Sequence, residues 1–221
     1  MALVLITGTN RGIGLALCRL YAERGDEVIA VCRKPSTALA ALKVDIIDGV
    51  ELTRPEDVAR LKEKLGKRTL DVLINNAGVA VFDDTLAAPK FDDMERQFRV
   101  NAMGPVRVVS ALQDNLGRGS KIALITSRMG SIADNGSGAY YGYRMSKAAL
   151  NIAGMSMARD LAKKGVAVAI LHPGFVKTDM TSGAGQVQPE ESARGLMARI
   201  DALSLSTSGS FWHANGETLP W

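Results

Sequence analysis

The sequence is poor in the residues that usually build disulfide frameworks, metal centres and nucleic-acid interfaces. Only two of its 221 residues are cysteines and only two are histidines. Cys18 and Cys32 fall in a predicted helix and a predicted strand, without metal-ligand spacing. We therefore expect reduced thiols, a cytoplasmic location and no metal. The formal net charge is only +4, and lysine and arginine are scattered without a run, which argues against a nucleic-acid partner.

Long apolar runs, internal repeats and low-complexity segments are also missing. The first apolar run, residues 2–6, is too short for a signal peptide or a membrane span. We therefore expect no membrane partner and nothing that directs export. A length of 221 residues, with 47% hydrophobic and 23% charged residues, is ordinary for one globular domain. We predict a single domain over residues 1–221, with a cofactor half at about 1–120 and a catalytic and substrate half at about 121–221.

What the sequence does contain is a regular alternation of short apolar runs with helical patterns. The runs predict strands at residues 2–7, 27–32, 70–75, 121–126, 166–172 and 210–212, with a weak one near residue 50. The helical patterns lie at residues 12–24, 55–65, 91–115, 141–164 and 189–202. This alternation predicts an α/β fold: a doubly wound Rossmann-type domain with a parallel sheet of about seven strands and helices on both faces. The third strand stays ambiguous, because residues 43–47 and 49–53 both alternate.

A glycine-rich turn follows the first predicted strand. Residues 7–14 read Thr-Gly-Thr-Asn-Arg-Gly-Ile-Gly and lead directly into the first predicted helix. Glycines let the backbone approach a ligand closely, and a helix N-terminus offers free N–H groups to a pyrophosphate. The spacing is GxxxGxG rather than GxGxxG, yet the strand–turn–helix context is that of a dinucleotide site. The alternative is a glycine-rich turn without a ligand. The residues assigned to this site are Gly8, Asn10, Arg11, Gly12, Ile13 and Gly14.

The end of the second predicted strand indicates which nucleotide is bound. A site for NAD(H) carries an acidic residue there to bind the ribose 2′-hydroxyl. This strand instead ends in Val-Cys-Arg-Lys, with Arg33 at the expected place. A guanidinium binds a 2′-phosphate, and Arg11 could assist. We therefore predict NADP(H) over NAD(H); the alternative is that Arg33 is a solvated surface residue.

Tyr143 and Lys147 lie four residues apart in a predicted helix, which places both side chains on one face. A free phenol has a pKa of about 10. An ammonium group beside it favours the phenolate and lowers the phenol pKa toward neutrality. The pair is therefore a candidate acid and base for an alcohol or carbonyl oxygen. Taken alone, this spacing is also typical of packing and solvation.

With these features in place, the chain resembles the short-chain dehydrogenase/reductase family over nearly its whole length. Residues 75–78 read Asn-Asn-Ala-Gly, where the family has a segment that supports the sheet and the cofactor. Asn101 matches the family's active-site asparagine, and Ser127 its catalytic serine. The resemblance implies further cofactor contacts from Asn76, Ala77, Gly78, Pro173, Gly174, Val176 and Thr178, besides Tyr143 and Lys147.

Four short sequence motifs resemble those of the C-factor-like and sniffer-like carbonyl reductase branch of that family. These motifs lie at residues 127–132, 143–151, 172–180 and 215–221. The resemblance implies hydride transfer between a nicotinamide and a carbonyl carbon. Tyr143 would be the acid or base, with Lys147 lowering its pKa, and Ser127 would bond the substrate oxygen. Asn101 would position a water that links Lys147 to solvent.

One departure from the family pattern concerns the adenine. The family usually has an acidic residue followed by an aliphatic one after the third strand. Glu51-Leu52 fits this place better than Asp45-Ile46, and we assign Glu51 and Leu52 to the adenine. The segment 179–188 occupies the place of the family's substrate loop, and its glycine, serine and alanine residues predict a short mobile lid.

The resemblance also implies partners and leaves alternatives open. A small-molecule carbonyl or alcohol is the expected substrate, but the sequence does not name it. Helices 91–115 and 141–164 pair across a two-fold axis in relatives, so we expect a homodimer, with a tetramer possible. A catalytically weak nucleotide-binding signalling or regulatory protein of C-factor type is the alternative. A second alternative is an NAD-dependent alcohol dehydrogenase, against which the missing acidic residue weighs. His172 is expected to be structural.

Overall fold

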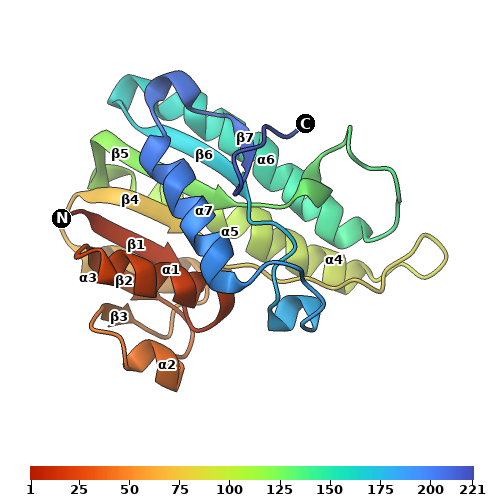
Figure 1. The fold of residues 1–221 in the computed structure, drawn as a ribbon, viewed down its shortest axis with the longest axis horizontal. Helices are drawn as coiled ribbons and strands as arrows, with labels where there is room; N and C mark the ends of the chain where they lie inside the picture. The colour runs from red at the N-terminus through yellow and green to blue at the C-terminus, as the bar shows by residue number, and fades with distance from the viewer.

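Seven parallel strands form one continuous sheet, as Figure 1 shows. The computed structural model describes residues 1–221. The strands lie in the order β3-β2-β1-β4-β5-β6-β7, and every neighbouring pair is parallel. Their bounds are β1 (Leu3–Thr7), β2 (Glu27–Val31), β3 (Asp45–Ile47), β4 (Leu70–Asn75), β5 (Leu116–Ile125), β6 (Ala167–His172) and β7 (Phe211–His213). The predicted Rossmann-type sheet is therefore confirmed.

Helices cover both faces of this sheet (Figure 1). Because successive strand residues point to opposite faces, Leu5 packs into one apolar cluster of 26 residues while Val4 and Ile6 pack into another of 23. The first cluster is closed by α3 (Pro55–Leu65), α5 (Gly104–Ala111) and α6 (Tyr141–Leu161), and the second by α1 (Gly12–Glu23) and α7 (Pro189–Ala202). None of the helices is long and apolar enough to span a membrane.

Two smaller features differ from the predicted pattern. The third strand is residues 45–47, within the first of the two alternatives, so the weak strand predicted near residue 50 is wrong. Val50 is buried, but it belongs to a turn in which its N–H bonds to Cys32 O at 3.1 Å rather than to a strand ladder. A short helix, α2 (Thr37–Ala40), is an addition that the sequence pattern did not predict.

The helix predicted over residues 91–115 is interrupted. It consists of α4 (Phe91–Phe98), a π-helical turn (Arg99–Met103), α5 and a 3-10 turn (Gln113–Asn115). Pro105 has no N–H to give to the carbonyl of Asn101 four residues earlier, and the N–H of Gly104 bonds instead to Arg99 O, five residues back. The wider π-helical turn therefore contains Asn101.

Candidate active site

The glycine turn between β1 and α1 lies directly against the segment after β4. A Cβ on Gly8, whose φ is +72°, would stand 2.6 Å from Ala77 Cα, and one on Gly14 would stand 2.2 Å from Gly8 O. The Asn76 amide donates to the carbonyls of Thr7 and Gly8 at 3.0 and 3.1 Å. This packing requires glycine, and it keeps the N-terminus of α1 free of any side-chain cap. The turn can therefore offer backbone N–H groups to an anion.

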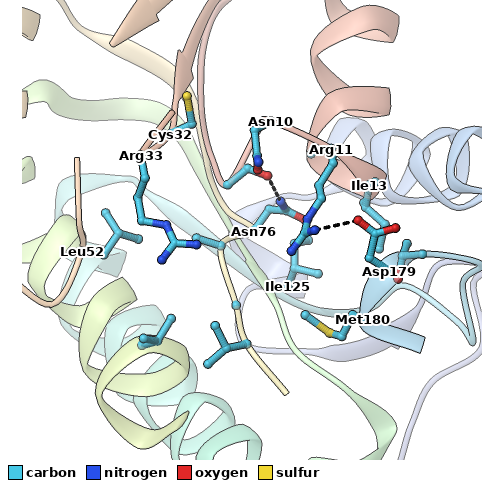
Figure 2. A pocket seen from close by; sticks show the side chains of 18 of the residues that line it. Asn10, Arg11, Ile13, Cys32, Arg33, Leu52, Asn76, Ile125, Asp179 and Met180 are labelled. Atoms are coloured by element: carbon cyan, nitrogen blue, oxygen red, sulfur yellow. Dashed lines mark hydrogen bonds and ion pairs between the residues drawn. The ribbon is translucent and has the colours of Figure 1, made fainter. Parts of the chain in front are cut away.

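A cavity of about 480 Å³ opens above this turn, along the carboxyl ends of the strands (Figure 2). It brings together most of the predicted site residues. The predicted residues that line it are Gly8, Asn10, Arg11, Gly12, Ile13, Gly14, Arg33, Glu51, Leu52, Asn76, Ala77, Gly78, Tyr143, Lys147, Pro173 and Thr178. Four predicted residues are outside this lining: Asn101, Ser127, Gly174 and Val176.

One end of the cavity is formed by Arg33 and the segment after β3. Arg33 is largely exposed and lies 3.5 Å from the Glu51 carboxylate. Leu52 is buried beside it, and its carbonyl accepts a bond of 2.6 Å from Arg107. Asp45, the alternative adenine residue, instead lies in β3 and pairs at the surface with a distant arginine. Glu51 and Leu52 therefore line the cavity, whereas Asp45 does not.

The other end of the cavity holds Tyr143 and Lys147, both buried on α6. The Lys147 ammonium donates to Ile125 O at 3.0 Å and lies 5.7 Å from the centre of the Tyr143 ring. Ser127 follows β5; its Oγ accepts a bond of 3.1 Å from Met129 N, and its hydroxyl is near enough to the Tyr143 phenol to lower the pKa of that phenol. Ser127, Tyr143 and Lys147 thus lie near one another at the carboxyl end of β5.

Asn101 lies behind this group, on the π-helical turn. Its amide donates to Val79 O and to Ser146 Oγ, at 2.8 and 3.0 Å, and its oxygen accepts from Val79 N at 2.8 Å. A Cβ added to Gly78 would stand 3.3 Å from the Asn101 oxygen and 3.7 Å from the Lys147 nitrogen. The Asn101 oxygen and the Lys147 nitrogen therefore both lie beside Gly78.

The titration of the pair differs from the sequence-based prediction. Burial raises the pKa of Tyr143 to about 12, although the hydrogen bond with Ser127 opposes this rise. Burial also lowers the pKa of Lys147 to about 8. The predicted fall of the phenol pKa toward neutrality is thus wrong for this structure, because burial is the largest effect on this phenol and disfavours the phenolate.

His172, which the sequence predicts to be structural, lies at the end of β6. Its ring packs edge-on against His213, with ring centres 4.9 Å apart. Burial, and then the nearby His213 and Arg128, lower the pKa of His172 to about 3. The ring therefore stays neutral at working pH and is not a candidate acid.

The segment predicted as a lid contributes Asp179 and Met180 to the cavity lining near the glycine turn. Arg11 pairs with Asp179 at 2.6 Å, and Figure 2 shows the two side chains pointing toward one another near Ile13. A Cβ on Gly185 would stand 2.2 Å from the Val176 carbonyl carbon, and Val187 N bonds to Phe175 O. The lid is thus packed against the strand end that precedes it, while the prediction that it is mobile stays a prediction.

Two residues near Tyr143 were missed by the sequence reasoning. The Phe82 ring lies edge-on to that of Tyr143, with centres 5.0 Å apart, and Asp84 accepts a bond of 2.7 Å from the N–H of Gly142. Both come from the loop between β4 and α4. The only local signal is an apolar residue followed by two aspartates, a pattern that does not distinguish a buried acid from an exposed one.

Among known proteins, this chain is similar to several dehydrogenases and reductases. It is 39% identical over 227 residues to 1-hydroxy-2-glutathionyl-2-methyl-3-butene dehydrogenase of Rhodococcus sp. strain AD45, covering 100% of both chains. It is also 46% identical over 154 residues to the C-signal protein of Myxococcus xanthus, covering 69% of this chain and 93% of that one.

Solved structures agree with the sequence comparison. The carbonyl reductase Sniffer of D. melanogaster superimposes with a TM-score of 0.92 at 27% identity, over 100% of both chains. An NADPH-bound carbonyl reductase from chicken fatty liver superimposes with a TM-score of 0.90 at 29% identity, over 100% of this chain and 99% of that one. The C-factor-like and sniffer-like resemblance is thereby confirmed. The family model for short chain dehydrogenases matches residues 2–188, and the chain belongs to this family of oxidoreductases.

Proposed function

We propose that the protein is an NADP(H)-dependent oxidoreductase that transfers hydride between the nicotinamide and a carbonyl or alcohol substrate. The observation that carries this proposal is the meeting of a glycine turn, Tyr143 and Lys147 in one cavity. The close approach of Gly8 and Gly14 to neighbouring backbone leaves the turn shaped for a pyrophosphate. When bound, the nicotinamide would supply or accept the hydride.

The protein's own residues would handle the proton and the geometry. Because the pKa of Tyr143 is raised, its phenol is protonated over the working pH range and suits the acid in carbonyl reduction. Ser127 would donate a hydrogen bond where negative charge develops on the substrate oxygen. Lys147 would hold the nicotinamide ribose and stabilise the phenolate that remains. Asn101 would hold a water that links Lys147 to solvent, so that Lys147 passes a proton to the Tyr143 phenolate and regains one from solvent through this water.

The preference for NADP(H) rests on Arg33 and on the absence of an acidic residue at the end of β2. Arg33 lines the cavity and is mostly exposed there, so its guanidinium can turn to a 2′-phosphate. Arg11 lines the same cavity from the glycine turn. The NADPH bound by the chicken carbonyl reductase, a relative with the same fold, supports the same choice. The Gly174 and Val176 backbone would border the nicotinamide.

Substitution of Tyr143 by Phe tests the proposal most directly. We expect Tyr143→Phe to lower NADPH oxidation with aldehydes, quinones, diketones and ketosteroids by at least about 100-fold, because general acid catalysis contributes about that much. NADPH binding, followed by nicotinamide fluorescence, should change by less than about threefold. Retention of turnover in this variant would place the acid elsewhere.

The pH dependence of wild-type activity tests the role of Lys147 beside Tyr143. Lys147 loses its charge as the pH rises through its pKa of about 8, whereas Tyr143 stays protonated until about 12. Loss of the ammonium removes its stabilisation of the developing phenolate, so kcat/KM for reduction should fall above about pH 8. A profile that stays level to pH 10 would contradict the role given to Lys147.

A signalling or regulatory role without turnover is the alternative, because C-signal of Myxococcus xanthus is a relative. Nucleotide binding needs the glycine turn but not a proton donor. Binding of NADPH without oxidation across the whole carbonyl panel would favour this alternative, and turnover that depends on Tyr143 would exclude it.

We propose a homodimer because α4 and α6 carry exposed apolar side chains. On α4, Phe91 is 72% exposed and Phe98 is 42% exposed. On α6, Met145 is 57% exposed and Ile152 is 67% exposed. A two-fold contact would bury them against their own copies. Light scattering should give the dimer mass or, in a tetramer, twice that value. A cytoplasmic location stays an expectation from the composition.

A further inference from the structure

The loop between β4 and α4, residues 79–90, contains a buried carboxylate that the proposed mechanism does not use. The Asp84 side chain is only 1% exposed, while the adjacent Asp83 is exposed and pairs with Lys90. Asp84 forms no direct ion pair, because the nearby Lys90 pairs with Asp83 instead. Burial of a carboxylate without a direct cation partner is costly unless hydrogen bonds replace its water. The contacts of Asp84 therefore indicate what the loop holds in place.

Those contacts lie at the start of the helix that carries Tyr143. Asp84 Oδ2 accepts from Gly142 N at 2.7 Å, and Asp84 O accepts from Tyr140 N at 3.2 Å. Tyr140 has a left-handed conformation with φ +53°, and α6 has no cap from its own N-cap side chain. The first turn of a helix leaves N–H groups without partners and favours negative charge. Asp84 thus supplies the cap of α6 from a segment 58 residues earlier.

The same turn is confined from the opposite side by α4. A Cβ on Gly142 would stand 2.5 Å from the Gln97 side-chain nitrogen and 3.0 Å from Met94 Cα. The Oδ1 oxygen of Asp84 and the side-chain nitrogen of Gln97 are both buried without a hydrogen-bond partner. Buried polar atoms without a hydrogen-bond partner are rare. These two therefore indicate that a requirement other than stability keeps Asp84 and Gln97 in this place.

The loop also touches the phenol-bearing ring itself. Phe82, two residues before Asp84, packs edge-on against the rings of Tyr143 and Tyr140, with centres 5.0 and 5.7 Å away. This loop therefore contacts both the backbone at the start of α6 and the rings of Tyr140 and Tyr143. We propose that Asp84 is a positioning residue: its bond to the N–H of Gly142 fixes the first turn of α6 and so aims the Tyr143 hydroxyl at the substrate oxygen. This inference rests on the function proposed above.

Four variants test this role. Asp84→Ala removes the acceptor, Asp84→Asn keeps an oxygen for the Gly142 N–H, and Asp83→Ala is the matched control at the exposed neighbour. Asp84→Ser, which is too short to reach, replaces the alanine variant if that variant does not fold. We expect Asp84→Ala to lower kcat about 10- to 100-fold, since small misplacements of a reacting group have effects of this size. NADPH affinity should stay within about threefold, and Asp84→Asn should recover most of kcat.

Hydrogen–deuterium exchange provides a readout that does not depend on turnover. Peptides covering residues 138–147 should exchange faster in Asp84→Ala than in the wild type, Asp84→Asn or Asp83→Ala, while peptides of the glycine turn should not change. Unchanged exchange and kcat in the alanine variant would overturn the proposal, as would an asparagine variant as impaired as alanine. A wild-type protein that oxidises no NADPH would contradict the proposed function alone, because the exchange comparison would still decide whether Asp84 holds the helix.

Discussion

The two sides of the cavity are built on different principles. The nucleotide side is held by backbone against backbone, as in the contact of Gly8 with Ala77 and of Gly14 with Gly8. The substrate side is held by side chains that reach between distant segments, such as Asp84 to Gly142 and Phe82 to Tyr143. Close backbone contact admits only glycine and so leaves a local sequence signature, whereas a side-chain contact between loops does not.

This difference predicts that the nucleotide side tolerates substitution least. A Cβ at residue 14 would lie 2.2 Å from Gly8 O, so the turn must shift in Gly14→Ala. We expect NADPH binding to be lost and unfolding to be easier by about 1–3 kcal/mol, the usual cost of overpacking. Fluorescence titration and thermal unfolding measure the two effects. Gly136→Ala is the control, because a Cβ there meets nothing within 4 Å. Normal NADPH binding by Gly14→Ala would show that no nucleotide lies on this turn.

A smaller effect is expected where a side chain, rather than the backbone, contacts the nucleotide. Arg33→Asp replaces an attractive charge by a repulsive one beside the 2′-phosphate. The ratio of NADPH to NADH efficiency should fall by about 10- to 100-fold, the range for a charge-assisted hydrogen bond. Lys34→Asp, at the next residue and outside the cavity lining, makes the same charge change and should leave the ratio nearly unaltered. Equal ratios in Arg33→Asp and wild type would refute the NADP(H) assignment.

The difference between local and long-range contacts also explains which parts of the fold and the site could be predicted from the sequence. The glycine turn and the Tyr143–Lys147 pair could be predicted because each depends on neighbouring residues with fixed spacing. Asn76, whose amide bonds to residues 68 and 69 positions earlier, was predicted only from the resemblance to the family. The break of the helix at Asn101 was missed although Pro105 gave a local signal, because a proline inside a helical pattern interrupts the helix before it. The direction of the Tyr143 pKa was predicted wrongly because burial cannot be deduced from spacing. Asp84 was missed because its partner lies 58 residues away.

The ion pair of Arg11 with Asp179 joins the nucleotide side of the cavity to the substrate side. Breaking this pair is expected to have the smallest of these effects on binding. Both side chains are about two-thirds exposed or more, and exposed pairs contribute only about 0.2–1 kcal/mol. Asp179 holds the guanidinium that we assign to the nucleotide phosphates. In Asp179→Asn the guanidinium is released, so the Kd for NADPH should fall by up to about fivefold at low salt, with a smaller change for NADH.

Asp114→Asn serves as the control for this prediction, because it breaks an exposed pair with Lys62 away from the cavity. It should leave both Kd values unchanged. Tighter binding of NADPH by Asp179→Asn would mean that the lid competes with the nucleotide for Arg11. Weaker binding would mean the reverse: the ion pair closes the lid over the nucleotide, and Arg11 acts on the substrate side of the cavity rather than on the phosphates.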